Sequence, residues 1–432
     1  MKHGEFIKSG LIMMLSSTFL FTVVQAETPG TDEMWKIIQQ QQKIIEQLQQ
    51  KLEITEQKVE IAEEKVEETA QEVESAVEAI EVAQSSANGS SSPSGTSGFD
   101  SSSMGSTFSK TSGLNRTSMG GYGELHYNSK DGNDEVDFHR FVLYFGHEFT
   151  DSIRFFSELE LEHALAGEGK SGEIELEQAW VELDINDNHR IRAGLDILPV
   201  GIINWTHEPN TFYGVERSEV EKRIIPSTWW EAGVGLNGEL APGWNYNVVL
   251  HSGLSTTSSI RSGRQKVSNA NADHPATTAR LQYTGVPGLE VSGSFQYQSD
   301  ITAGATTQSN SATLFEGHVD YKHSSGLGLR ALYAQWDLDD ELQAGRDDDQ
   351  QYGYYIEPAY RFPVKFLPGE IGVFARWSEL DYANNKEEER IGVGFNYWPT
   401  SGLAFKFDWT SIDDVDADTS TDTLNLGIGY QF

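Results

Sequence analysis

The sequence predicts an all-β fold, a 16-stranded antiparallel transmembrane β-barrel preceded by an α-helical coiled coil. Three observations lead to this prediction. Apolar and polar residues alternate from about Gly120 to the C-terminus, as they do in half-buried strands. Aromatic residues recur at both ends of these stretches, which is typical of a membrane barrel. An earlier segment carries an unbroken seven-residue repeat of apolar residues, which indicates a coiled coil.

The composition excludes several classes of protein. The chain has 432 residues, with 66 acidic and 31 basic side chains and a formal net charge of −35. This balance disfavours a nucleic-acid-binding protein, which needs a basic surface to neutralise phosphates. Because there is no cysteine, disulfides, thiolate metal sites, a cysteine nucleophile and lipoprotein acylation are all excluded. The 41 glycines and 11% aromatic residues suit a barrel whose polar lumen and loops dilute an apolar outer face.

Residues 1–26 are expected to be a signal peptide. Lys2 and Lys8 precede an apolar stretch that runs from Leu11 to Val24, and Ala26 supplies a small residue at the cleavage point. We therefore expect cleavage after Ala26 and export of the mature chain. The alternative is an uncleaved membrane anchor, but the apolar stretch is short and is interrupted by serine and threonine.

Residues 31–84 are expected to form an oligomeric coiled coil in the periplasm. Apolar residues recur at every seventh position, namely Ile38, Ile45, Leu52, Val59, Val66, Val73 and Ile80. Such a strict repeat requires partner helices, and since the chain has one such segment, the partners must be other copies. The residues three positions after each of these are mostly small or polar, such as Gln41, Thr55 and Ala62, so the sequence leaves dimer and trimer open. The Ser/Gly-rich residues 85–119 are predicted to be a flexible linker.

Residues 120–432 are expected to form the barrel. The first two of sixteen alternating stretches cover residues 120–127 and 136–149, and short turns alternate with longer polar connections such as 412–421. This alternation places both barrel ends on the short-turn side, which is periplasmic in outer-membrane barrels. Aromatic residues near the long-loop side are expected to face the membrane interface, and these include Tyr127, Trp230, Trp336 and Trp409. A soluble β-sandwich is the alternative that these aromatic belts disfavour.

The C-terminal stretch carries a family resemblance. Leu424–Phe432 ends in Phe432 with Tyr430 two residues before it, and it resembles the signal by which Gram-negative assembly machinery recognises outer-membrane proteins. The barrel segment resembles a porin of the phosphate-selective porin O and P type, in Tyr122-Gly123-Glu124-Leu125-His126-Tyr127, in Asp137-Phe138-His139-Arg140 and in its acidic third strand. It also resembles sugar porins that carry an N-terminal periplasmic coiled coil.

This resemblance implies a trimeric, water-filled passive channel in the cell outer membrane. The implied partners are further copies of the chain, outer-membrane lipid and lipopolysaccharide, and the barrel assembly machinery, which would recognise Phe432. The segment departs from the basic ladder on which phosphate selectivity in that family relies. From residue 119 onward, acidic residues outnumber basic residues by more than two to one, so we expect a weak preference for cations.

Alternation also predicts which charged residues face the lumen, because a charge in hydrocarbon costs several kcal/mol. The expected pore-lining residues are Arg140, Arg154, Glu158, Glu160, Arg190, Arg192, Asp196, Arg330, Arg361, Arg376 and Arg390. The long connection from Val200 to Trp229 is the candidate constriction loop. Its candidate residues are Glu208, Glu216, Arg217, Glu219, Lys222 and Arg223. The alternative is an external loop that packs at the barrel mouth or on a neighbouring protomer.

The sequence contains no motif typical of an enzyme. H-E-x-x-H, a Gly-rich phosphate loop before a helix and a G-x-S-x-G turn are all missing, so we expect no catalytic residues, cofactor or metal site. A Ser/His pair on the barrel exterior, as in an outer-membrane lipase, is a minor alternative. Two functions remain, a passive porin and a structural protein whose rods space the envelope layers.

Overall fold

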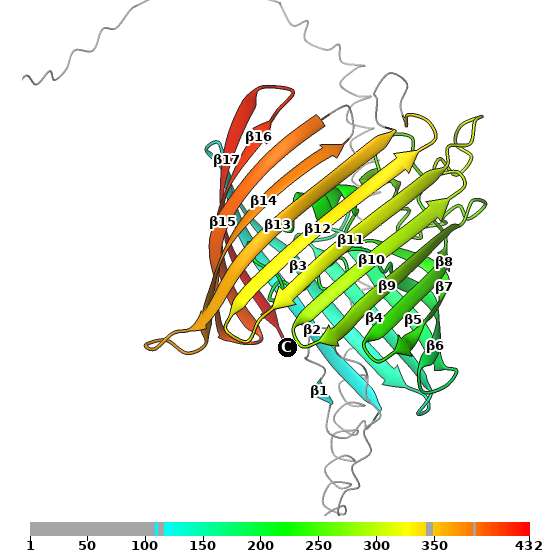
Figure 1. The fold of residues 1–432 in the computed structure, drawn as a ribbon, viewed down its shortest axis with the longest axis horizontal. Helices are drawn as coiled ribbons and strands as arrows, with labels where there is room; N and C mark the ends of the chain where they lie inside the picture. Colours follow the sequence, from blue (N-terminus) through cyan, green and yellow to red (C-terminus); the bar gives the residue numbers. More distant parts are fainter. Residues whose placement is uncertain (1–108, 111–115, 343–348, 383–385) are drawn as a thin grey trace, which may run out of the picture. The chain divides into compact units, whose positions relative to one another are not determined.

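The computed structural model describes residues 109–110, 116–342, 349–382 and 386–432, which form one barrel (Figure 1). The expected signal peptide, the coiled coil and most of the linker lie outside the described residues. None of the described helices is long and apolar enough to cross a membrane.

Sixteen strands form a closed antiparallel barrel, which confirms the predicted fold class. The strands are β2 Thr117–Lys130, β3 Asn133–Glu148, β4 Ile153–Glu162, β5 Ile174–Asp184, β6 His189–Ile197, β7 Trp230–Ala241, β8 Trp244–His251, β9 Ala276–Val286, β10 Leu289–Gln298, β11 Ala312–Lys322, β12 Leu327–Leu338, β13 Gln350–Pro363, β14 Glu370–Tyr382, β15 Lys386–Thr400, β16 Leu403–Asp414 and β17 Thr419–Gln431. Each strand pairs with its neighbours in sequence, and β17 pairs with β2 to close the ring. A two-residue strand, β1 (Ser109–Lys110), pairs with the start of β2 inside the segment expected to be unstructured linker.

Two connections on the long-loop side are shorter than expected. Strands β2 and β3 continue beyond their predicted ends and are joined by Asp131 and Gly132, whose φ angles are 50° and 79°. Positive φ at both central residues is what a type I′ hairpin turn requires, and Asp-Gly favours this turn. Likewise, β16 and β17 extend into the expected connection 412–421, so that only residues 415–418 separate them.

The outer face of the barrel is apolar and the inner face is polar along β16 and β17. Leu424, Leu426 and Ile428 are exposed, whereas Asn425 and Lys406 on the other face are buried. This arrangement suits a barrel in lipid, whose outward residues meet hydrocarbon. Two expected interface aromatics do not lie on the outer face: Trp230 and Trp336 are 3% and 0% exposed, unlike Trp409 at 37%.

The interior contains a hydrophobic cluster as well as polar groups. The connection between β6 and β7, residues 198–229, folds into the barrel, and we call it the inward loop. Its apolar residues Leu198, Val200, Val220, Ile224 and Trp229 belong to one buried cluster with strand residues that include Leu314, Leu332, Trp336 and Leu380. Its short π-helix, η1 (Val220–Ile224), contacts β12, β13 and β14 and is visible inside the barrel (Figure 1). Trp336 points inward by the same alternation that turns Arg330 and Leu332 inward, and the inward loop gives it an apolar partner.

Candidate functional site

The inward loop is held by arginines from three strands. The guanidinium groups of Arg140, Arg330 and Arg376 each donate a hydrogen bond of 2.9 Å to a loop carbonyl, those of His207, Thr211 and Tyr213 respectively. A charged donor makes such bonds stronger than bonds between neutral groups. These three arginines, all expected to line the pore, therefore also position the loop.

Strands β15 to β17 hold the same part of the loop from another side. The amide of Val215 donates to Asp408 Oδ2 at 2.6 Å, and the side chain of Asn396 donates to the carbonyl of Phe212 at 2.9 Å. On β17, a Cβ atom added to Gly429 would lie 2.5 Å from Cβ of Pro209. The absence of a side chain at this glycine therefore permits the close approach of the loop to the wall.

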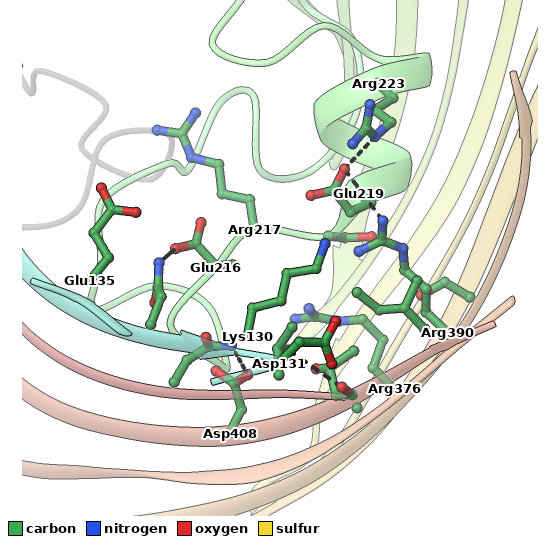
Figure 2. Close-up of a pocket in the computed structure, with 18 of the residues that line it drawn as sticks. Lys130, Asp131, Glu135, Glu216, Arg217, Glu219, Arg223, Arg376, Arg390 and Asp408 are labelled. Carbon is green, nitrogen blue, oxygen red and sulfur yellow. Dashed lines mark hydrogen bonds and ion pairs between the residues drawn. The ribbon is translucent and has the colours of Figure 1, made fainter. Parts of the chain in front are cut away.

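A cavity of about 510 Å³ lies between the loop and this wall, and charges of both signs line it (Figure 2). The loop contributes Glu216, Arg217, Glu219 and Arg223, and the strands contribute Arg376, Arg390 and Asp408 among others. Arg390 lies 4.0 Å from Glu219, which also accepts a hydrogen bond of 2.6 Å from Arg223. The surface of this cavity can therefore attract ions of either sign, with Arg390 and Glu219 on facing elements.

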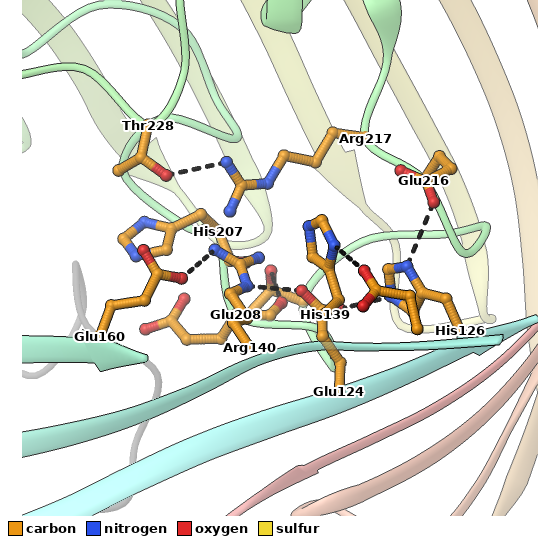
Figure 3. Close-up of polar contacts among 12 residues, drawn as sticks. Glu124, His126, His139, Arg140, Glu160, His207, Glu208, Glu216, Arg217 and Thr228 are labelled. Carbon is orange, nitrogen blue, oxygen red and sulfur yellow. Dashed lines mark hydrogen bonds and ion pairs between the residues drawn. The ribbon is translucent and has the colours of Figure 1, made fainter. Parts of the chain in front are cut away.

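A second cavity of about 100 Å³ lies near strands β2 to β5. Its wall carries Glu124, Glu160 and Glu177, and the connections opposite contribute Arg217, Arg264 and Lys266 among other residues. Figure 3 shows Arg217 on the loop side, where it donates to Thr228 at 2.8 Å. The small cavity therefore has a mainly acidic strand side, which also carries Arg140, and a mainly basic loop side, which also carries Glu216.

His126 connects the wall to the loop between these two cavities. Its ring nitrogens lie 3.2 Å from Glu124 and 3.1 Å from Glu216, and the ring stacks on His139 at 4.7 Å between centroids (Figure 3). Burial alone would raise the pKa of Glu216, but the hydrogen bond and charge of His126 outweigh it and hold this pKa well below its usual value. Glu216 thus stays ionised as a fixed negative charge of the loop.

The predicted site residues fall into three groups. Arg376, Arg390, Glu216, Arg217, Glu219 and Arg223 line the larger cavity. Arg140, Glu160 and Lys222 line the smaller one, as do Glu216 and Arg217. The predicted residues that line neither of these two cavities are Arg154, Glu158, Arg190, Arg192, Asp196, Arg330, Arg361 and Glu208. Of these, Glu208 is buried in the loop, and burial raises its pKa.

Several residues outside both cavities form ion pairs near the short turns. Arg154 and Arg192 bind Glu182 at 3.1 and 2.9 Å, and Arg192 also binds Asp196 at 3.0 Å. Arg190 binds Asp184 at 3.2 Å. Farther around the barrel, Arg361 binds Glu370 at 2.6 Å. Alternation predicted charged residues here, but pairing has neutralised much of their field.

Sequence reasoning missed Glu177 because a β-bulge breaks the alternation of β5. The register between β4 and β5 shifts next to Glu158, so that the adjacent residues Glu177 and Gln178 are both buried. It also missed Arg264 and Lys266, which lie in the connection 252–274, expected to be one of the longer polar connections. No local sequence signal reveals the β-bulge or the positions of Arg264 and Lys266. The apolar residues on both faces of β12 could, however, have indicated that the barrel interior is packed.

Comparison with known proteins agrees with the barrel. Residues 270–432 match the family described as outer membrane protein beta-barrel domain. A protein of Aquifex aeolicus (strain VF5), described as uncharacterized, is 29% identical over 351 residues, which cover 73% of this chain and 80% of that protein.

Three solved structures share the fold at low sequence identity. The anion-selective porin from Comamonas acidovorans is 12% identical, with a TM-score of 0.51 over 73% of this chain and 99% of that one. The outer membrane channel DcaP of Acinetobacter baumannii is 14% identical, with a TM-score of 0.50 over 73% and 97%. OmpF of Salmonella typhi, in complex with daunomycin, is 14% identical, with a TM-score of 0.51 over 73% and 97%. The chain therefore has the β-barrel fold of outer-membrane porins.

Proposed function

We propose that this protein is a passive outer-membrane porin, a water-filled channel for ions and small polar solutes that is narrowed by the inward loop. The observation that carries the proposal is the cavity of about 510 Å³ between loop and wall, with fixed charges of both signs. An apolar outer face and a charged inner face support the same function. The channel acts without catalysis.

The finer features of the proposal rest on the sequence. We infer a signal peptide at residues 1–26 from its charged and apolar stretches, and a periplasmic coiled coil at 31–84 from its heptad repeat. We infer a trimeric assembly from the resemblance to porins of the phosphate-selective porin O and P type. Lipopolysaccharide and the barrel assembly machinery are the proposed partners at the membrane. The excess of acidic residues favours a weak preference for cations over phosphate specificity.

A second function is proposed on the heptad repeat alone. Residues 36–84, which contain the seven-residue repeat from Ile38 to Ile80, would form a rod of roughly 70 Å at about 1.5 Å per residue. Such a rod could hold the envelope layers at a fixed distance, with conduction a secondary property of the barrel.

Single-channel recording of the purified protein in a planar bilayer under a salt gradient tests the porin. We expect current steps in groups of three and a reversal potential on the cation side. Detergent without protein is the control, and a change in gel mobility on heating verifies that the barrel is folded. A folded barrel that carries no current would contradict the porin and favour the spacer.

A further inference from the structure

Three buried ligand-type side chains meet where the inward loop touches the barrel wall. Glu158 of β4, Glu177 of β5 and His207 of the loop are 0%, 1% and 3% exposed. Each offers one nitrogen or oxygen atom, and these atoms all lie within 4.8 Å of one another. His207 Nε2 is 3.2 Å from Glu158 Oε1 and 3.8 Å from Glu177 Oε2. The group thus connects two strands to the loop.

The arginine that donates to the backbone of His207, Arg140, is already engaged by other carboxylates. Arg140 donates to Glu124 at 2.5 Å and lies 3.7 Å from Glu160, so its single charge serves two other carboxylates. Among the described residues, Glu177 Oε2 and Oε2 of the neighbouring loop residue Glu208 have no hydrogen-bond partner. Buried carboxylate oxygens without partners are costly, so a cation or a proton at this position would stabilise the folded chain.

The orientation of His207 also indicates that a positive charge belongs in this group. Its Nδ1 lies 3.2 Å from the carbonyl oxygen of Asn204, which can only accept, so Nδ1 must carry the hydrogen. The other nitrogen, Nε2, then faces two carboxylates. A lone pair on Nε2 would repel them, so either a proton or a metal ion must lie between these atoms. A ring whose Nδ1 donates to a backbone carbonyl is the usual arrangement of a metal-binding histidine.

Glu158 is oriented by its own partners. Gln178 Nε2 donates to Glu158 Oε2 at 2.5 Å, and Trp180 Nε1 donates to Gln178 Oε1 at 3.2 Å. These bonds occupy one carboxylate oxygen and direct the other toward His207. The β-bulge that turns Glu177 and Gln178 inward together is what supplies both the third ligand and this support.

We propose that Glu158, Glu177 and His207 bind one divalent metal ion of the zinc type, which clamps the inward loop to the wall. One imidazole nitrogen and two carboxylate oxygens form a donor set that Zn²⁺ accepts, whereas Ca²⁺ and Mg²⁺ prefer oxygen alone. Two positive charges would balance Glu158 and Glu177. This inference goes beyond the channel function and does not depend on conduction.

Binding of Zn²⁺ to the folded full-length chain, after treatment with a chelator, tests the site. We expect calorimetry to find one tight equivalent per chain, and Glu177→Gln or His207→Asn to weaken it at least about tenfold. His251→Gln is the matched control, because this buried histidine contacts Thr278 elsewhere and should leave binding unchanged. Equal zinc binding by all three variants would overturn the proposal.

A second variant and a second readout allow for ligand variants that do not fold. Gln178→Ala keeps all three ligands and should weaken Zn²⁺ binding by about tenfold through the loss of orientation. Bound Zn²⁺ should also raise the unfolding temperature of the unchanged chain, because it binds only the folded state. If the chain shows neither binding nor a shift at micromolar Zn²⁺, a proton occupies the site and the proposal fails. A silent channel that binds zinc would overturn the porin and leave this site standing.

Discussion

At the scale of the residue, inward-facing arginines in this barrel do two kinds of work. Arg140, Arg330 and Arg376 donate to carbonyls of the inward loop and so hold its backbone. Arg376 also lines the larger cavity, and so does Arg390, which binds Glu388 at 2.5 Å and faces Glu219. We therefore expect the arginines that line the larger cavity to govern which ions pass, because their electrostatic field acts on ions inside the cavity.

Replacing Arg390 with glutamate should increase cation selectivity. One charge about 4 Å from an ion is worth about 1 kcal/mol in water, and the change of sign alters the local charge by two units. We expect the reversal potential under a KCl gradient to move toward the cation limit. Arg190→Glu is the matched control, because Arg190 lines neither cavity. An equal or larger shift in that control would place the filter near the short turns.

Asp300 should make the connection between β10 and β11 sensitive to acid. Its carboxylate accepts hydrogen bonds from the amides of Thr302, Gly304 and Asn310, at 3.0 to 3.1 Å. Burial alone would raise the pKa of Asp300, but these bonds and the Thr302 hydroxyl lower it below the usual value. A lowered pKa stabilises the connection above the unfolded pKa of about 3.9, and the stabilisation is lost as the pH falls through the folded pKa.

Hydrogen exchange checks this expectation. Protection of these three amides, corrected for intrinsic exchange, should fall below about pH 4 in the unchanged chain. In Asp300→Asn, protection should be lower at neutral pH and should not change with acid. Protection that responds to acid equally in both proteins would show that another group is responsible.

At the scale of the element, the inward loop is amphipathic without being a regular helix or strand. Val220, Ile224 and Trp229 pack into the hydrophobic cluster, while Glu216 and Glu219 line the larger cavity. Its backbone is fixed by side chains of the strands, including Trp336, whose Nε1 donates to the carbonyl of Ile224 at 2.8 Å. The strands therefore act as the template on which this loop folds.

Trp336→Ala should release the loop from the wall. Removing a buried tryptophan typically costs about 3 to 5 kcal/mol, and here the hydrogen bond to the loop is lost as well. We expect a lower unfolding temperature and a noisier current in single-channel recording. Trp409→Ala is the matched control, because this tryptophan is on the outer face and 37% exposed. Quiet, unchanged current in Trp336→Ala would show that the loop holds its place without this anchor.

At the scale of the whole molecule, the inward loop divides the interior of the barrel into an apolar side and a polar side. The hydrophobic cluster fills the side toward β11 to β14, while the larger cavity borders β2, β3 and β14 to β17. The larger cavity is therefore displaced toward the closing pair β17 and β2. The pairing of these two strands, which makes the barrel continuous, also forms part of the wall beside this space.

Deleting residues 31–84 separates the porin from the spacer. If the heptad repeat only assists assembly, the deletion variant should conduct as the full chain does and leave the envelope intact. If the rod spaces the envelope layers, the barrel should still conduct but the cells should lose envelope integrity. Deleting part of the linker alone, residues 89–96, is the control for a change in chain length.

The number and direction of the strands could be predicted because they depend on local patterns, whereas the inward facing of Trp230 and Trp336 was missed. Alternation with a period of two decides which face a side chain takes, and a closed barrel makes one face lipid and the other lumen. Asp131-Gly132 shows the limit of this prediction, since a short turn extended two strands where a longer loop was expected. Glu177 shows a second limit of this prediction, because a β-bulge turned its side chain inward against the alternation.

By itself, the sequence determined that this chain forms sixteen antiparallel strands with charged residues on the inner face. Only the tertiary structure decided which of those charges meet water, which anchor a loop and which converge with His207. The reason is the distance along the chain between the partners. Val215 and Asp408 are 193 residues apart, and Arg376 and Tyr213 are 163 apart, yet each pair is joined by a hydrogen bond. Local periodicity carries no information about such contacts, because they exist only once the barrel closes around the inward loop.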